Sequence, residues 1–250
     1  WGGSISATDV ENLTLSGFKG LITVNSGVEN LTITDAEQFT LSSATGLKSV
    51  TLDVDKVSDP DATAAVKAVA AYGKAVTGYS GTTPALEFSS MTNLTSVSLT
   101  GFFRDLTFTG LPNLTSIDID ADFEDLKIYN SDGLTSVDVT GSSFRNVWVE
   151  GNDALTSLEL DHTTGLAFAG SATASTYATF KVTDNDELLS LTSSADKYRT
   201  FTLTSNAKLA TINFDGLDGI GTSSTVDPTV DVYSNALVAS LASDTDDGLT

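Results

Sequence analysis

The sequence predicts a mostly β protein, a repeat β-solenoid in which each coil of about 20 residues contains two short strands. Three observations lead to this prediction. A phrase of the form L-x-x-Φ-x-Φ, in which Φ is apolar, recurs along the chain. Its clear copies begin 20, 20 and 21 residues apart, and a second short apolar alternation follows most copies. A fixed period indicates stacked coils, because one coil cannot bury its own apolar side and must share a core with its neighbours.

The clear copies of the phrase are Leu94/Val97/Leu99, Leu114/Ile117/Ile119, Leu134/Val137/Val139 and Leu155/Leu158/Leu160. Looser copies begin at Val10, Val28, Leu47, Leu188, Leu209 and Val238. The second alternation is found at Phe39/Leu41, Leu106/Phe108, Leu126/Ile128, Val147/Val149 and Phe201/Leu203. A period of two indicates half-buried strands. The solenoid is either a right-handed β-helix or leucine-rich-like. An antiparallel sandwich is the alternative, but sandwiches do not hold so constant a period over four units.

Two longer intervals interrupt the period. Between Leu47 and Leu94, Asp59 is a suitable helix cap, Pro60 suits the first helical position, and apolar residues follow at helical spacing. We therefore expect a helix at residues 60–77, within an inserted segment at 55–82. Between Leu155 and Leu188, a stretch of small residues predicts a loop insertion at 163–180. We expect residues 1–250 to form a single elongated solenoid, and the final DDGLT, which resembles SDGLTS at 131–136, suggests part of a longer chain.

The composition excludes several classes of function. The 33 acidic and 12 basic residues give a formal net charge of −21, which repels nucleic acid and anionic lipid and attracts cations. The chain contains no cysteine, so it has no disulfide and no thiol chemistry. No apolar run approaches the roughly 18 residues of a membrane span. We expect no nucleic-acid partner and no membrane insertion.

Acidic side chains recur at the outward position between the two Φ residues of the phrase. Neighbouring coils lie about 4.8 Å apart, so these carboxylates would form a column of like charges, which destabilises a sheet. A bridging Ca²⁺ would relieve the repulsion, since calcium prefers several oxygen ligands. The candidate calcium ligands are Asp118, Asp120, Asp122, Asp138, Glu159 and Asp161. The alternative is a solvated acidic face that is screened by salt.

Three further sets of residues bear on function. Arg104, Glu124 and Arg145 occupy equivalent positions and predict a salt-bridge ladder. Four NLT triplets, at Asn12, Asn30, Asn93 and Asn113, are formal glycosylation acceptors, although asparagine also satisfies backbone groups in turns. His162 is the only histidine, and the sequence has no nucleophile elbow or phosphate-binding loop. We therefore do not expect an enzyme.

The copies NLTSVSL, NLTSIDI and ALTSLEL resemble the L-x-x-L-x-L half of leucine-rich repeats and the coils of receptor-L-like solenoids. They differ in lacking a helix in each repeat and the asparagine of the leucine-rich-repeat strand. The wider composition, with a pI of about 4.1, no cysteine and much threonine, serine, aspartate and alanine, resembles bacterial or archaeal surface-layer proteins. This resemblance implies secretion to the cell surface, self-assembly into a sheet or filament and, frequently, calcium dependence.

The leading expectation is an extracellular structural protein that self-assembles into a surface layer or filament with the help of cations. Its partners would be copies of itself and cell-surface polysaccharide. The alternative is a cell-surface adhesin or carbohydrate-binding module that uses an exposed threonine and aromatic face with Tyr129 and Trp148. Ice binding is a third hypothesis, but the T-x-T triplets at 107–109 and 202–204 are too far apart for a regular array.

Overall fold

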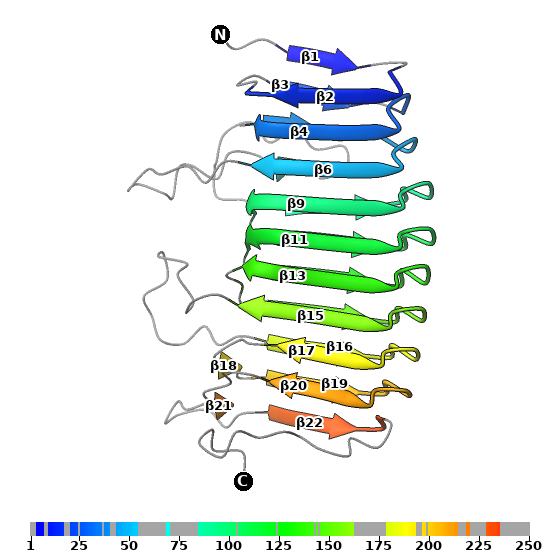
Figure 1. Cartoon of the computed structure of the whole chain (residues 1–250), viewed down its shortest axis with the longest axis vertical. Coiled ribbons are helices and arrows are strands. Elements are labelled where there is room, and N and C mark those ends of the chain that lie inside the picture. The colour runs from blue at the N-terminus through cyan, green and yellow to red at the C-terminus, as the bar shows by residue number, and fades with distance from the viewer. Residues whose placement is uncertain are drawn as a thin grey trace.

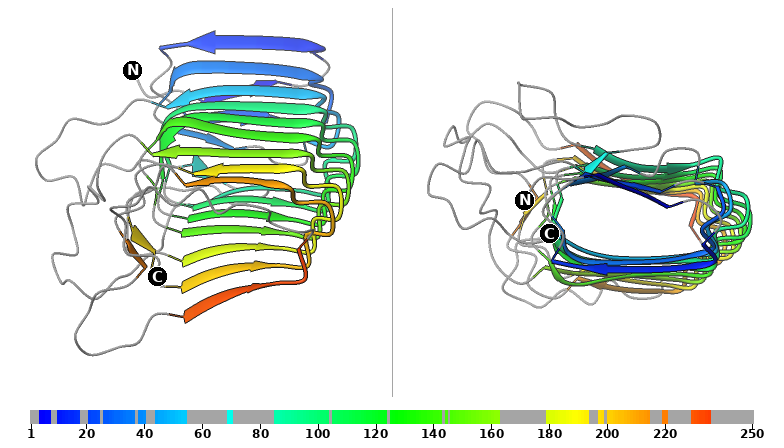
Figure 2. Two further views of the ribbon diagram at one scale, coloured as in Figure 1. Left: turned by 60° about the horizontal axis from the view of Figure 1, so that its bottom comes forward. Right: turned by 90° about the horizontal axis from the view of Figure 1, so that it is seen from above.

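The structure, a computed structural model, describes residues 4–7, 10–17, 21–24, 26–36, 38–40, 44–54, 69–70, 85–103, 105–123, 125–142, 144, 146–162, 179–193, 197–198, 200–214, 219–220 and 229–235. Over these residues the chain is a β-solenoid whose parallel strands stack along the long axis (Figure 1). Each coil contributes to two facing sheets, and the view along the axis shows these sheets on opposite sides of the core (Figure 2). The predicted fold class is confirmed.

One side of the solenoid is a nine-stranded sheet that contains the recurring phrase. Its strands are, in order, β2 (Asn12–Ser16), β4 (Asn30–Ala36), β6 (Ser49–Val54), β9 (Ser96–Phe102), β11 (Ser116–Asp122), β13 (Ser136–Ser142), β15 (Ser157–His162), β17 (Ser190–Ser193) and β20 (Thr211–Phe214). All neighbours in this sheet are parallel. The serine that opens β11 pairs in register with the serines that open β9 and β13. The period of the sequence is therefore the register of the sheet.

The strands that alternate with these along the chain form the opposite side. A seven-stranded sheet contains β8 (Ala85–Ser89), β10 (Asp105–Thr109), β12 (Asp125–Tyr129), β14 (Asn146–Glu150), β16 (Thr179–Thr183), β19 (Thr200–Thr204) and β22 (Thr229–Tyr233). A four-stranded sheet contains β1 (Ser4–Ala7), β3 (Leu21–Val24), β5 (Gln38–Thr40) and β7 (Val69–Ala70). A short pair is formed by β18 (Lys197–Tyr198) and β21 (Gly219–Ile220).

The structure describes only a few residues of the two predicted insertions. Within the expected helix at 60–77, the two described residues Val69–Ala70 form β7, which pairs in parallel with β5. At these residues the helix prediction is wrong, because the edge of a sheet offers hydrogen-bond partners that override a helical sequence pattern. The rest of 55–82 lies outside the described residues, as do residues 163–178 of the predicted loop, and β16 already begins at Thr179. No helix in the described part has the length and hydropathy needed to cross a membrane.

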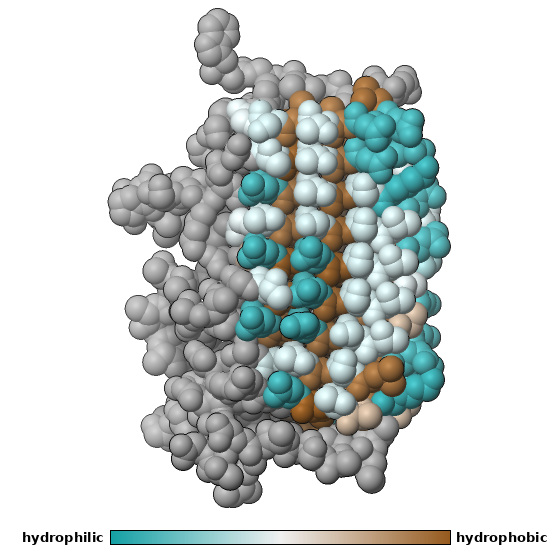
Figure 3. Space-filling model, viewed as in Figure 1, coloured by the Kyte–Doolittle hydropathy of each residue, from teal (hydrophilic) through white to brown (hydrophobic). Residues whose placement is uncertain are grey.

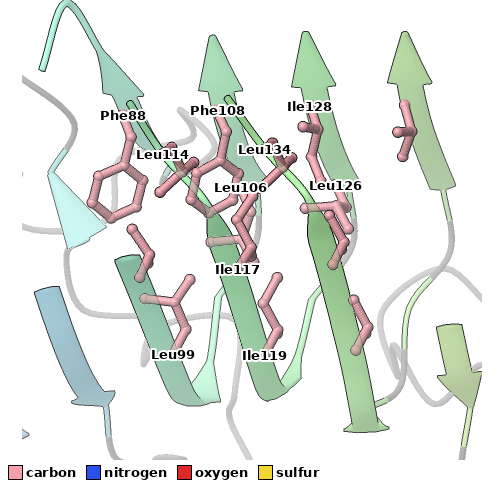
Figure 4. Packing of buried hydrophobic residues seen from close by; sticks show 14 of the residues in the cluster. Phe88, Leu99, Leu106, Phe108, Leu114, Ile117, Ile119, Leu126, Ile128 and Leu134 are labelled. Carbon is pink, nitrogen blue, oxygen red and sulfur yellow. The ribbon is translucent and has the colours of Figure 1, made fainter. Parts of the chain in front are cut away.

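The core is formed by the inward side chains of the two sides, and like residues stack on like along the solenoid (Figure 4). Phe88 and Phe108, for example, lie parallel with ring centroids 5.0 Å apart. In β13 the predicted alternation is confirmed, since Val137 and Val139 are 1% and 0% exposed and Asp138 between them is exposed. Stacked aromatic rings add to the stabilisation that burial of apolar area provides.

Each strand of the seven-stranded sheet is followed directly by a residue with left-handed backbone. These residues have φ between 49° and 65° and are Ser90, Gly110, Asn130, Gly151, Asp184, Ser205 and Ser234. Glycine adopts this conformation without a steric penalty, and asparagine and aspartate tolerate it better than most residues. The turn therefore explains why small and polar residues recur at this point of the period.

Buried asparagines form a ladder two residues beyond this sheet's strands. Asn152, Asn185 and Asn206 are 0% exposed. Oδ1 of Asn185 accepts hydrogen bonds from the backbone N and the Nδ2 of Asn152 at 3.2 and 3.1 Å, and Oδ1 of Asn206 accepts the same pair from Asn185. Asn235 continues the ladder. The recurring phrase itself lacks this asparagine, as the sequence analysis states, and the ladder residue follows the second strand instead, as in VWVEGN at 147–152.

The threonine of the phrase L-T-S links each coil to the one before it. The hydroxyl of Thr115 donates to the backbone carbonyl of Thr95 at 2.9 Å, and Thr135 and Thr156 repeat this contact one coil further on at the same distance. The same carbonyl oxygens also accept from the backbone N–H of these threonines, at 2.8, 3.0 and 3.0 Å, so each coil is joined to the one before it by a pair of hydrogen bonds at this residue. The invariance of the phrase therefore reflects inter-coil hydrogen bonding as well as the core.

Candidate functional site

The predicted acidic column exists on the outer face of the nine-stranded sheet. Asp118 pairs in register with Asp138, which pairs with Glu159, and all three side chains are exposed. Hydrophilic side chains run in columns along this face (Figure 3). The column continues with hydroxyl residues on both sides, Ser98 and Thr192. The charged part is thus restricted to three neighbouring coils.

The other three predicted calcium ligands lie around this column. Asp120 is exposed and pairs with Thr100, whereas Asp161 is half-buried on β15. Asp122 ends β11 and pairs through its backbone with Phe102. Among the described residues, no three aspartate, glutamate or histidine side chains converge on a point that could hold a metal. In-register strands space the carboxylates along a line, so the arrangement favours diffuse or pairwise attraction of cations.

One member of the column, Asp138, has a pKa above its usual value. Burial raises the pKa of the Asp138 carboxyl above its usual value, and the negative charges of Asp118 and Asp161 raise it further. The side chain is nevertheless exposed, so solvent screens much of the interaction. The repulsion between Asp138 and its acidic neighbours therefore destabilises the folded state by about 0.5 kcal/mol, which is typical of like charges that face each other on two adjacent strands.

Asp138→Asn is expected to increase the free energy of unfolding by about 0.5 kcal/mol at neutral pH, because it removes this repulsion. The folded state binds the Asp138 proton more tightly than the unfolded state, so the penalty is absent below the unfolded pKa of about 3.9 and complete above the raised folded pKa. Urea unfolding of both proteins at pH 7 and pH 3 measures this difference. A gain that persists undiminished at pH 3 would contradict the electrostatic explanation.

A second group of side chains lies on the outer face of the seven-stranded sheet. We define the Trp148 patch as six residues on β12, β14 and β16: Asp125, Lys127, Tyr129, Trp148, Glu150 and Lys181. Lys127 and Lys181 flank Trp148 in register, and Tyr129 pairs with Glu150. The Lys127 ammonium lies 5.0 Å from the centroid of the Trp148 ring, a cation–π contact.

The charges of this patch are paired with each other. Lys127 Nζ lies 3.1 Å from Asp125 Oδ2, and Lys181 Nζ lies 2.5 Å from Glu150 Oε2. Burial raises the pKa of the Tyr129 phenol, and the carboxylates of Glu150 and Asp125 raise it further. The phenol therefore keeps its proton at neutral pH and can donate a hydrogen bond.

Sequence reasoning identified only the two aromatic residues of this patch. The signal for the two lysines was the middle residue of Φ-x-Φ in the second strand, Lys127 in LKI and Lys181 in FKV. The partners could not be assigned, because Glu150 and Lys181 are 31 residues apart and meet only through the register of β14 and β16.

The predicted ladder of Arg104, Glu124 and Arg145 lies outside the described residues. Two other ion pairs join neighbouring turns, Lys48 with Glu29 at 2.6 Å and Lys208 with Glu187 at 2.5 Å. They are exposed, and pairs of this kind contribute about 0–1 kcal/mol. Their role is therefore to support the register between coils.

The four NLT asparagines occupy two different places. Asn93 and Asn113 lie in turns and donate from Nδ2 to the backbone carbonyls of Thr45 and Thr92, at 3.1 and 2.6 Å. Asn12 and Asn30 instead begin β2 and β4, and Asn30 donates to the side chain of Asn12 at 2.8 Å. The amides therefore contribute to contacts between coils, in agreement with the structural interpretation of the triplets.

The fold and the two outer faces place this chain in the structural class of β-solenoids. No known protein family matches the sequence, and searches of curated proteins and of solved structures returned no match either.

Proposed function

We propose that this chain is a secreted structural protein of a cell surface, which associates with further copies of itself into a layer or filament. The observation that carries the proposal is the edge of the nine-stranded sheet at β2. The inward residues Leu13 and Leu15 are only partly buried, whereas Leu31 and Ile33, their partners on β4, are each 1% exposed. Among the described residues, no strand of this sheet covers the two leucines on the side away from β4.

An edge strand with exposed apolar side chains favours pairing with another strand. A coil of a second copy would extend the parallel ladder of β2 and cover both leucines. If half of each side chain is still to be buried, the two leucines together would contribute about 2 kcal/mol. Stacking between different surfaces of two copies is head to tail, and it continues into a filament when the rotation between copies does not close a ring.

The net charge of −21 opposes this association. We propose that calcium assists it by accumulating along the acidic column of Asp118, Asp138 and Glu159. A divalent cation reduces repulsion between copies more effectively than a monovalent one at equal ionic strength. Calcium would then act between molecules as well as within one.

Sedimentation of the full mature protein over a concentration series tests the proposal, with calcium chloride and with sodium chloride plus chelator at matched ionic strength. We expect concentration-dependent oligomers that are larger in calcium. The double variant Leu13→Lys/Leu15→Lys should weaken association at least about tenfold, the equivalent of 1.4 kcal/mol.

Thr14→Lys is the matched control, because it adds a charge on the outward face of the same strand and should leave association unchanged. A strict monomer at high concentration in both salts would reject self-assembly. Equal loss of association in the control would show that charge, rather than the two leucines, controls the contact.

A further inference from the structure

The Trp148 patch is electrically neutral on a strongly acidic protein. Its two lysines and two carboxylates form two ion pairs, at 3.1 and 2.5 Å, while the whole chain carries −21. The acidic column on the opposite sheet has no such compensation from its in-register neighbours, which are Ser98 and Thr192. The two outer faces therefore suit different partners.

The aromatic residues of the patch do not belong to the core. On β14 the core side chains are Val147 and Val149, both 0% exposed, and Trp148 between them lies on the outer face and is partly exposed. Tyr129 is also partly exposed, one coil earlier on the same face. A large aromatic ring on a solvent face is typical of binding surfaces, because it presents apolar area at little cost in conformational entropy.

The surroundings of the indole are fixed before any ligand arrives. The cation–π contact with Lys127 restricts the ring, and the ion pairs hold the two carboxylates and the two ammonium groups around it. Lys127 and Lys181 retain 31% and 37% exposure of their side chains, so their ammonium groups remain accessible. Charge-assisted hydrogen bonds are about twice as strong as neutral ones.

We propose that the Trp148 patch binds a neutral polysaccharide. A pyranose ring has one largely apolar C–H face and a rim of hydroxyls, which match an aromatic ring bordered by fixed donors and acceptors. The pairing of both lysines and the overall negative charge disfavour an anionic polymer. The in-register strands β12, β14 and β16 place Lys127, Trp148 and Lys181 in one row across three coils, which suits an extended chain that crosses several coils.

Affinity electrophoresis in gels that contain soluble β-glucan, galactomannan or polygalacturonate tests this proposal. We expect at least one of the two neutral polymers to retard the protein and polygalacturonate to have no effect. Titration of a Trp1→Phe variant with a hexasaccharide of the retarding polymer should change tryptophan fluorescence saturably, because Trp148 is then the only tryptophan.

Trp148→Ala should weaken binding at least about tenfold. Trp148→Phe, which keeps an aromatic ring, should retain part of the affinity and controls for misfolding. Thr202→Ala is the matched control, since Thr202 follows Lys181 in the same column of the sheet. No retardation by either neutral polymer, retardation by polygalacturonate alone, or equal loss of binding in Thr202→Ala would each overturn the proposal. Sedimentation of the same variants keeps this result separate from self-assembly.

Discussion

Val137→Asp is expected to destabilise the solenoid by about 3–5 kcal/mol, because it places an unpaired charge in the core. Val137 is 1% exposed and lies between Ile117 and Leu158 in the stack, both of which are also buried. The aspartate would face apolar side chains of the neighbouring coils on both sides. Urea unfolding followed by circular dichroism measures the loss.

The adjacent substitution Asp138→Val is the control for this prediction. Asp138 is exposed and pairs with Asp118 and Glu159, so valine should leave the fold intact and remove a like-charge contact. The two substitutions differ by one position along one strand, and only the side of the sheet distinguishes them. Equal tolerance of both would contradict the placement of Val137 in the core.

Asn185→Ala is expected to cost about 3 kcal/mol or more, since it removes a buried group with several partners. Asn185 accepts hydrogen bonds from the backbone N and the Nδ2 of Asn152, and its own Nδ2 donates to the carbonyls of Val149 and Thr183 at 3.1 and 2.9 Å. Alanine leaves the backbone N–H of Asn152 without its acceptor, whereas Nδ2 of Asn152 keeps the carbonyls of Ile128 and Glu150. Each unsatisfied buried group costs about 1–3 kcal/mol.

Asn213→Ala provides the comparison, because Asn213 is exposed on β20 and pairs only through the backbone register with Thr192. Its substitution should change stability by less than about 0.5 kcal/mol. Chemical denaturation of both variants measures the difference. A similar small effect in both would show that solvent replaces the ladder, and that the asparagines contribute little to the stability of the stack.

The sequence alone was sufficient to predict the solenoid and the orientation of its clearest strands. A constant period of about 20 residues and a strict alternation such as Val137-Asp138-Val139 both follow from local rules, since side chains of a strand alternate between two faces. The same rules correctly placed Asp118, Asp138 and Glu159 in one column. The face of the sheet on which a side chain lies can thus be predicted from its position in the repeat.

The tertiary structure decided which side chains meet and what the irregular segments do. Val69–Ala70 carried a helical pattern and became a strand, because pairing with β5 outweighed local propensity. The carboxylates share a column without converging, which depends on the spacing of strands rather than on the order of residues. Asn152 and Asn185, like Glu150 and Lys181, are joined across an interruption of the period, and only the stacking of β14 on β16 brings them into contact. Local sequence patterns determine the two strands of each coil. Contacts between coils depend on the register at which the chain resumes strand pairing after each interruption of the period.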